Sequence, residues 1–296
     1  MRLVKTIKEV REIVNEWKKE GLSVGLVPTM GFLHEGHKSL IERSVKENDK
    51  TVVSVFVNPI QFAPNEDLEA YPRDIEHDKK LVSDAKADLI FNPEPEEMYG
   101  AHFTTLVNTT EVSENLCGAK RPIHFGGVCT VLTKLFNIVK PTRAYFGQKD
   151  AQQLAVVKRF VKDLNFDIEI IGCPIIREAD GLAKSSRNTY LNKEERQAAL
   201  ILSKSLKLGL DKIKEGERDA KVIIDVITKS LQTEKLARID YVSIVDNENI
   251  QYIDKIEGEI LCAIAVYIGK TRLIDNFIYK CEDYYAKNRN VKFQNS

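Results

Sequence analysis

Hydrophobic residues in the first part of the chain recur in alternating helical and strand-like patterns. Apolar side chains fall at helical spacing over residues 6–20 and Gly21 ends the run, which predicts a helix. The short apolar segment 22–29 (LSVGLVPT) predicts a strand, and a helix is expected from 37 to 45. The β-branched run TVVSVFV at 51–57 is typical of a strand that is buried on both faces of a parallel sheet.

The same alternation continues for another hundred residues. It predicts parallel βαβ units with right-handed crossovers. In such sheets ligands bind beyond the carboxyl ends of the strands, so the loops at Pro28, Asn58 and Gly147 are expected to share one crevice. The predicted pairs of helix and strand are 74–87 with DLIFNP, 128–139 with RAYFG, and 150–164 with FDIEIIG.

The pattern of predicted helices and strands changes after about Ile176. Two long charged helical stretches are followed by strand-like segments, which predicts a smaller α+β domain without a Pro/Gly/Ser linker before it. The expected domains are therefore an α/β domain, 1–176, and a C-terminal domain, 177–296. The segments in the second are helices at 193–215 and 219–234, then RIDYVSIVD and EILCAIAVYIG.

Composition narrows the class of protein. Of 296 residues, 44 are basic and 44 acidic, so no global field favours nucleic acid or an anionic membrane. The longest apolar run, ILCAIAVYI, is about half of the ~20 residues that span a bilayer, and the charged N-terminus does not form a signal peptide. Five cysteines without a C-x-x-C pair indicate reduced thiols. A cytoplasmic protein without nucleic-acid or membrane partners is expected.

The stretch PTMGFLHEGHKSL, residues 28–40, contains several residues that could bind a metal ion or a phosphate group. A metalloprotease helix needs histidines at i and i+4, whereas His34 and His37 are at i and i+3 around Glu35. A phosphate-binding P-loop needs glycine directly before its lysine, but His37 stands before Lys38. What remains is either a glycine-containing turn that presents a helix N-terminus to an anion, or an ordinary turn with incidental histidines. The stretch alone leaves both open.

Two further loops place polar groups after predicted strands. Asn58 and Gln61 in SVFVNPIQF are amides that orient a carboxylate or hydroxyl without adding charge. In YFGQKDAQQL, Lys149 beside a helix N-terminus suits a polyphosphate, while Asp150 is equally explained as an N-cap. For each loop, a simple capped turn is the structural alternative.

The segment DGLAKSSRNTYL, residues 180–191, holds four consecutive donor side chains. Two hydroxyls, an ammonium and a guanidinium without an anionic acceptor form a phosphate-binding set, although such a run is also common on surfaces. Together with the H-x-G-H turn upstream, the set becomes specific. The four residues are Lys184, Ser185, Ser186 and Arg187.

H-x-G-H after the first predicted strand and a Lys-Ser loop at the end of the sheet resemble the HIGH and KMSKS signatures of the adenylyl-transferring superfamily. Within it, the chain resembles the pantothenate synthetase (pantoate–β-alanine ligase) family from Val27 to Leu191, and the total length fits. The matching stretches, in family order, are PTMGFLHEGHKSL, VSVFVNPIQF, EDLEAYPRD, RPIHFGGVCTVL, FGQKDAQQL and READGLAKSSRNTYL.

The resemblance implies an ATP-dependent ligase of pantothenate (vitamin B5) and coenzyme A biosynthesis. Pantoate and ATP would give pantoyl-adenylate and pyrophosphate, and β-alanine would then give pantothenate and AMP. The resemblance also implies a Rossmann-like parallel-sheet domain for residues 1–176, a C-terminal α+β lid domain, a homodimer and Mg²⁺ bridging the phosphates. The magnesium ligands stay open, with Asp78 as one candidate.

The resemblance assigns roles to individual residues. His37 would be the proton donor. His34 and Lys149 are expected, from their own donor chemistry, to be the other catalytic groups and to hold the phosphates. Gln61 and Gln153 would bind pantoate, and Gln61 also β-alanine. The implied ATP-binding residues are Met30, Gly31, Phe32, Leu33, His34, Glu35, Gly36, His37, Gly147, Gln148, Lys149, Asp150, Ile176, Lys184, Ser185, Ser186 and Arg187.

Two departures from the family pattern and three rival functions accompany the resemblance. Lys184 stands where many relatives have Met, and residues 148–151 (QKDA) stand where relatives often have Glu-Lys-Asp-Tyr. Both changes are expected to keep or increase the positive charge around the phosphates. A tRNA synthetase shares both signatures, but the balanced charge opposes it. The second rival is a nucleotide sensor without catalysis, and the third is a metal hydrolase.

Overall fold

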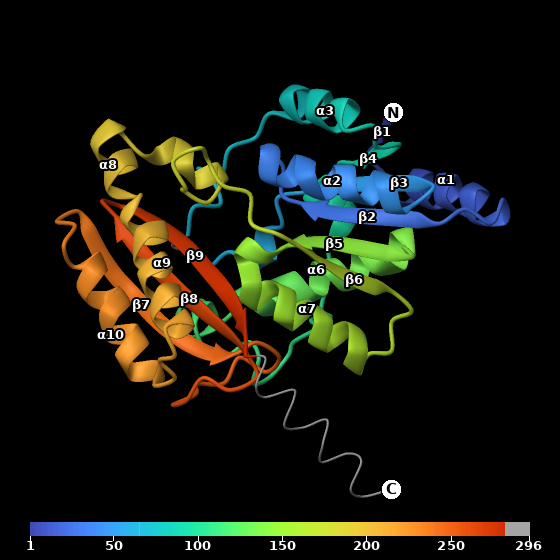
Figure 1. Ribbon diagram of the computed structural model, residues 1–296. Coiled ribbons are helices and arrows are strands. Elements are labelled where there is room, and N and C mark those ends of the chain that lie inside the picture. The colour runs from blue at the N-terminus through green and yellow to red at the C-terminus, as the bar shows by residue number, and fades with distance from the viewer. Residues whose placement is uncertain (65, 282–296) are drawn as a thin grey trace, which may run out of the picture. The chain divides into compact units, whose positions relative to one another are not determined.

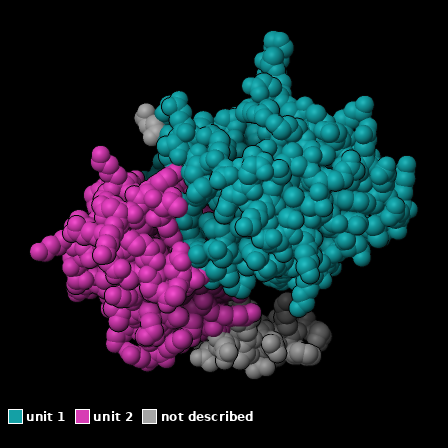
Figure 2. Space-filling view, turned by 90° about the horizontal axis from the view of Figure 1, so that it is seen from above, with its two compact units in different colours: residues 1–148, 156–176, 184–186 teal, residues 149–155, 177–183, 187–296 magenta. Residues whose placement is uncertain are grey.

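The structure is a computed structural model that describes residues 1–64 and 66–281. These residues form two compact units, which Figure 2 colours separately. The predicted division into domains 1–176 and 177–296 stays a prediction, because the two units exchange short segments. The first unit comprises 1–64, 66–148, 156–176 and 184–186, and the second comprises 149–155, 177–183 and 187–281. Residues 282–296 of the predicted second domain lie outside the described residues.

The first unit is built on a parallel sheet of six strands (Figure 1). All of its strand pairs are parallel, as the alternation of helices and strands predicts. The strand order is β1-β4-β3-β2-β5-β6. The strands are β1 (Arg2–Val4), β2 (Val24–Thr29), β3 (Lys50–Val55), β4 (Leu89–Phe91), β5 (Arg143–Gly147) and β6 (Glu169–Cys173).

Helices flank this sheet, and the long ones match the predicted helices (Figure 1). Helix α2 begins at Glu35 rather than after His37, so that His37 lies within its first turn. The helices are α1 (Ile7–Lys19), α2 (Glu35–Glu47), α3 (Ile75–Asp84), α4 (Pro95–Met98), α5 (Cys117–Lys120), α6 (His124–Val139) and α7 (Ala151–Asp163), with 3₁₀ turns η1 (Pro59–Gln61) and η2 (Gln148–Asp150).

The strands of the first unit are apolar because both of their faces are covered. Residues 51–55 of β3 are all buried, and β2 is buried at five of its six positions. Ile41 from α2 and Tyr145 from β5 belong to one core cluster with residues of these strands, and both are fully buried. The β-branched run at 51–57 therefore forms the interior strand that its composition predicts.

Strand β2 lies between β3 and β5, and this is where the sheet changes direction. From β2 the chain first builds outward through β3 and β4, and later crosses to β5 and β6 on the other side. The loops after Thr29, Val55 and Gly147 thus follow three adjacent parallel strands at a topological switch point, the usual place of a ligand site in open α/β sheets.

The second unit contains an antiparallel sheet of three strands in the order β7-β8-β9. Helices α9 and α10 pack against each other, and residues such as Leu202, Ile223 and Ile227 lie in the core together with apolar residues of β8. The smaller α+β domain predicted from the sequence is confirmed as a fold class. Its elements are α8 (Lys193–Ala198), α9 (Ile201–Lys214), α10 (Ala220–Leu231), β7 (Ala237–Asp246), β8 (Glu259–Ile268) and β9 (Thr271–Lys280), after the 3₁₀ turn η3 (Ser186–Tyr190).

Three details of the prediction are corrected. The helix expected at 193–215 is divided into α8 and α9, because the amides of Leu200 and Leu202 bond three residues back and tighten the chain between the helices. Strands β1 and β9 were not predicted. The β9 sequence TRLIDNFIYK is not a simple alternation, since the polar residues Asp275 and Asn276 are themselves buried.

Two predictions about the whole chain are also tested by the described residues. All five cysteines are free thiols, and four of them are buried. No helix within residues 1–64 and 66–281 combines the length and the apolar character that crossing a bilayer requires.

Candidate active site

The H-x-G-H turn connects β2 to α2 through an unusual backbone. Gly31 has φ of 85° and Phe32 has φ of 50°, so two consecutive residues are left-handed. Glycine adopts this conformation freely, whereas a bulky residue there costs about 1–3 kcal/mol. The Thr29 hydroxyl accepts a hydrogen bond from the Gly31 amide at 3.2 Å. Such strain persists only where surrounding groups hold the turn.

Asp78 of α3 holds that turn with both of its carboxylate oxygens. The Phe32 amide donates to Oδ2 at 2.9 Å and the Leu33 amide donates to Oδ1 at 2.7 Å, while the side chain is almost fully buried. Burial raises the pKa of Asp78, and the two amide hydrogen bonds act in the opposite direction. His77 adds a contact between its Nε2 and the Leu33 carbonyl at 2.9 Å. Both oxygens of Asp78, which the sequence indicates as a candidate magnesium ligand, therefore accept hydrogen bonds from the turn.

The two histidines of the motif lie side by side, as their i and i+3 spacing predicts. Their ring centroids are 4.1 Å apart. His34 is the N-cap of α2, and its Nδ1 accepts from the Gly36 amide at 3.1 Å. The Nδ1 of His37 accepts from the His34 amide at 3.2 Å. Because each Nδ1 accepts, each neutral ring carries its proton on Nε2, and both imidazoles are set up as Nε2–H donors.

The amide loop after β3 lies against the same turn. Gln61 is buried, and its Nε2 is 3.0 Å from the Sδ of Met30 at the end of β2. Asn58 donates to Gln61 Oε1 at 3.0 Å and accepts from the Tyr99 hydroxyl at 2.7 Å. The structure therefore brings Met30 and Gln61 together. It also adds Tyr99, which follows α4 in a segment without any recognisable motif and was missed in the sequence.

The Lys-Ser segment is tied to the H-x-G-H helix within the first unit. The Lys184 amide donates to the Ile176 carbonyl at 2.9 Å, and Lys184 Nζ lies 2.8 Å from Glu35 Oε2. The hydrogen bond from Lys184 lowers the pKa of Glu35, so this carboxyl stays ionised and balances the lysine. The additional positive charge expected from lysine at 184 is accordingly offset. Ser186 is buried at the start of η3.

Four of the predicted site residues belong to the second unit. Lys149 is followed by Asp150, whose Oδ2 lies 4.0 Å from Lys149 Nζ. The carbonyl of Lys149 accepts from Asn276 Nδ2 at 2.9 Å, which ties this segment to β9. The four are Lys149, Asp150, Gln153 and Arg187, whereas the other predicted residues, from Met30 to Ser186, lie in the first unit.

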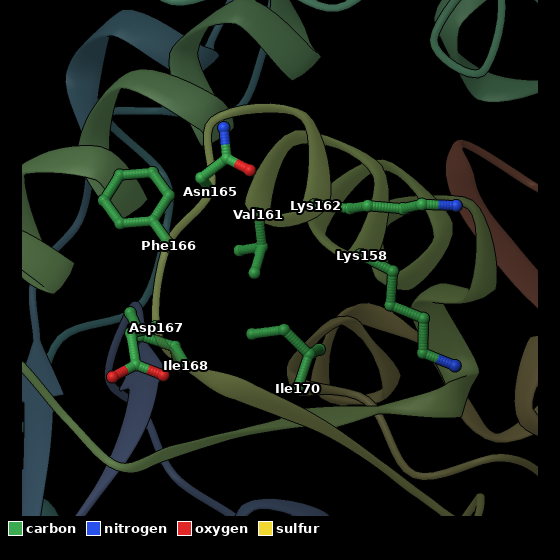
Figure 3. Close-up of a pocket in the computed structure, with 8 residues that line it drawn as sticks. All are labelled: Lys158, Val161, Lys162, Asn165, Phe166, Asp167, Ile168 and Ile170. Atoms are coloured by element: carbon green, nitrogen blue, oxygen red, sulfur yellow. The ribbon is translucent and has the colours of Figure 1, made fainter.

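The first unit also contains a hollow of about 620 Å³. It opens between α7 and the chain that leads into the edge strand β6 (Figure 3). None of the predicted site residues lines it. The described residues also contain no group of three His, Cys, Asp or Glu side chains arranged to hold a metal ion. The lining residues are Lys158, Val161, Lys162, Asn165, Phe166, Asp167, Ile168 and Ile170.

Comparison with known proteins identifies the family. A family model described as pantoate-β-alanine ligase matches residues 2–278. The chain belongs to the pantoate-β-alanine ligase family. Pantothenate synthetases from Clostridium botulinum (strain Loch Maree) and Enterococcus faecalis are each 61% identical to the chain, over 280 and 282 residues, and the match covers 95% of this chain and 100% of theirs.

Solved structures of pantoate-β-alanine ligases share the fold. The pantothenate synthetase of Thermus thermophilus superposes with a TM-score of 0.89 at 42% identity, over 94% of this chain and 99% of that one. The ligase of Francisella tularensis, described as complexed with β-γ ATP and β-alanine, gives a TM-score of 0.75 at 34% identity, over 94% and 97%. The Rossmann-like class and the ligase family implied by the sequence motifs are thereby confirmed.

Proposed function

We propose that the protein condenses pantoate with β-alanine to pantothenate, using ATP and releasing AMP and pyrophosphate. Family membership supports the overall reaction. The main structural support for this reaction is the pair of imidazoles of His34 and His37. Each ring is fixed through its Nδ1 to a backbone amide at a helix N-terminus. Two neutral donors beside the positive end of a helix suit the phosphates of a nucleotide.

The first step joins the pantoate carboxylate to the α-phosphorus and forms pantoyl-adenylate as pyrophosphate leaves. A carboxylate is ionised at neutral pH and needs no general base, so the main barrier is the approach of an anion to a polyphosphate. Positioned donors lower that barrier. His37 donates from Nε2 to the bridging oxygen of departing pyrophosphate, and His34 and Lys149 hold the phosphates.

The second step is attack by the β-alanine amine on the mixed anhydride, which expels AMP. Gln61 and Gln153 hold the acyl group, and Gln61 also contacts β-alanine. Pantoate carries a carboxylate and two hydroxyls, which match the donors and acceptors of carboxamides. The roles of Lys149, Gln153, Asp150 and Arg187 rest on the family match of their segments.

ATP enters as its Mg²⁺ complex. Magnesium in such enzymes is held mainly by phosphates and water with one or two carboxylates, so a site without a dedicated protein cage fits it. Because both Asp78 oxygens accept backbone amides, the protein's contribution to the ion is expected elsewhere. Asp150 is the candidate within the predicted ATP-binding set, because the other carboxylate of that set, Glu35, is paired with Lys184. The other residues of that set bind the nucleotide through backbone amides and the Lys184–Arg187 donors.

The remaining proposals concern the roles of the two domains, the oligomeric state and the cellular location of the protein. Residues 1–176 form the ATP- and pantoate-binding domain, and 177–296 form the lid domain. The active form is a homodimer, and it works in the cytoplasm, where ATP is available. Sedimentation velocity on the purified protein tests the dimer: a single species of twice the chain mass is expected, and a monomer at micromolar concentration contradicts it.

The reaction is tested by mixing purified protein with pantoate, β-alanine, ATP and Mg²⁺. Mass spectrometry should detect pantothenate, and AMP should form in equal amount. Formation of ADP instead would indicate an acyl-phosphate mechanism and would refute the adenylate. ATP binding by calorimetry without any product would favour the nucleotide sensor.

A further inference from the structure

A chain of side-chain hydrogen bonds runs from Tyr99 to Gln61 inside the first unit. The Tyr99 hydroxyl donates to Asn58 Oδ1 at 2.7 Å. Asn58 Nδ2 then donates to Gln61 Oε1 at 3.0 Å. The Nε2 of Gln61 is thereby left on the side of Met30, at 3.0 Å from its sulfur. We propose that Tyr99 is a positioning residue for pantoate, which acts through Asn58 to fix the orientation of the Gln61 carboxamide. The inference rests on the proposed function.

Both N–H donors of the Asn58 carboxamide are used in this arrangement, and its oxygen accepts one bond. It is almost fully buried, and its Nδ2 also donates to the Gly127 carbonyl at 3.0 Å. Two donated bonds and one accepted bond hold the carboxamide on three sides. Turning it over would place Nδ2 against the Tyr99 hydroxyl and Oδ1 against two acceptors, so the amide has one satisfied orientation.

The orientation of Gln61 follows from that of Asn58. Since Asn58 presents an N–H to Gln61, the oxygen of Gln61 faces Asn58 and its NH₂ group faces Met30. Met30 lies in the segment predicted to bind ATP, next to the H-x-G-H turn. Gln61 therefore offers a donor to its ligand, which complements the carboxylate or a hydroxyl oxygen of pantoate.

The backbone of Gln61 is fixed independently of its side chain. His124 Nδ1 contacts the Gln61 carbonyl at 3.1 Å. Helix α6 passes so close that a Cβ on Gly127 would lie 2.5 Å from Gln61 Cα. With the main chain held in this way, the freedom left to Gln61 is in its side-chain torsions, which is where the Tyr99 chain acts.

Tyr99 is suited to a permanent donor role. Burial raises the pKa of Tyr99, so its hydroxyl keeps its proton at neutral pH. The ring is held by Phe103, with centroids 4.9 Å apart, and by Lys134, whose Nζ is 5.9 Å from the ring centroid. These contacts do not involve the hydroxyl, so Tyr99→Phe removes one hydrogen bond and leaves the packing in place.

The test compares Tyr99→Phe with Tyr145→Phe. Tyr145 is a buried tyrosine of the same unit whose hydroxyl donates to Glu47 Oε2 at 2.9 Å, outside the chain to Gln61. For Tyr99→Phe, kcat/KM for pantoate should fall about 3- to 10-fold, the ratio that one net hydrogen bond supports, while KM for ATP changes less than about twofold. Tyr145→Phe should leave both constants near wild type.

A double-mutant cycle separates positioning from a general loss of packing. If Tyr99 acts through Gln61, then Tyr99→Phe should have no further effect on pantoate in a Gln61→Ala background. Effects that multiply in the double variant, or equal losses for pantoate and ATP in Tyr99→Phe, would overturn the proposal. If wild type and Tyr145→Phe both fail to form pantothenate, the proposed function itself is refuted.

Discussion

Replacing Asp78 with Asn is expected to destabilise the H-x-G-H turn without changing its volume. The carboxylate accepts amides from Phe32 at 2.9 Å and Leu33 at 2.7 Å. An asparagine side chain keeps one acceptor, but its NH₂ group must face the second amide, so one buried donor loses its partner. An unsatisfied buried donor costs about 1–3 kcal/mol, which is the expected loss in the free energy of unfolding.

A matched control exists on the same helix. Asp74 is the N-cap of α3, and its Oδ1 accepts a single amide, from His77 at 3.0 Å. Asparagine caps helices as well as aspartate does, so Asp74→Asn should change the free energy of unfolding by less than about 0.5 kcal/mol. Both substitutions replace a carboxylate with a carboxamide, so a change in net charge cannot explain a difference in stability between the two variants.

Urea unfolding followed by circular dichroism measures the difference. Asp78→Asn should lower the midpoint at an unchanged m-value, since the surface exposed on unfolding stays the same. The left-handed backbone at Gly31 and Phe32 should then be held less firmly, and amide exchange in the turn should quicken relative to Asp74→Asn. Equal stability of the two variants would refute the view that Asp78 holds the turn.

Other predictions concern catalysis and acid stability. His37→Ala should slow pantoate-dependent exchange of pyrophosphate into ATP by about 10²- to 10³-fold, the value of one preorganised donor, and near-wild-type exchange would rule out its role. Gln153→Ala should raise KM for pantoate more than for ATP, whereas equal effects would indicate a structural residue. Burial acts to raise the pKa of Glu66, but hydrogen bonds and charge from Arg121 outweigh it and lower the pKa. A lowered folded-state pKa contributes stability above the unfolded value of 4.5, which is lost as pH falls through the lowered one. The stability advantage of wild type over Arg121→Met, read from urea unfolding, should therefore shrink below about pH 4. An advantage independent of pH would contradict the pairing.

The elements that position the site follow from periodicity because the first unit is a layered α/β structure. Strands buried on both faces are continuous apolar runs, and the β3 run at 51–55 is fully buried as expected. The i and i+3 spacing of His34 and His37 places both rings on one face of the first helical turn. Such local relations between residues close in sequence are readable without a structure.

The contacts that fix the site join residues distant in sequence, and no local pattern encodes them. Asp78 is 45 residues from Leu33, and Tyr99 is 41 residues from Asn58. The amphipathic pattern of α3 does not indicate that Asp78 is buried, or that its carboxylate accepts hydrogen bonds from the distant H-x-G-H turn. Strand β9 was missed for a related reason, since its buried Asp275 is satisfied by Arg177 in another segment, at 2.7 and 2.9 Å.

Exchange of labelled pyrophosphate into ATP tests the central proposal, adenylation before ligation. The assay contains enzyme, Mg²⁺, ATP, labelled pyrophosphate and pantoate, and no β-alanine. If pantoyl-adenylate forms reversibly, label should enter ATP at a rate that depends on pantoate and vanishes without it. Pantothenate synthesis by a preparation that shows no such exchange, or shows it only when β-alanine is added, would contradict the adenylate mechanism.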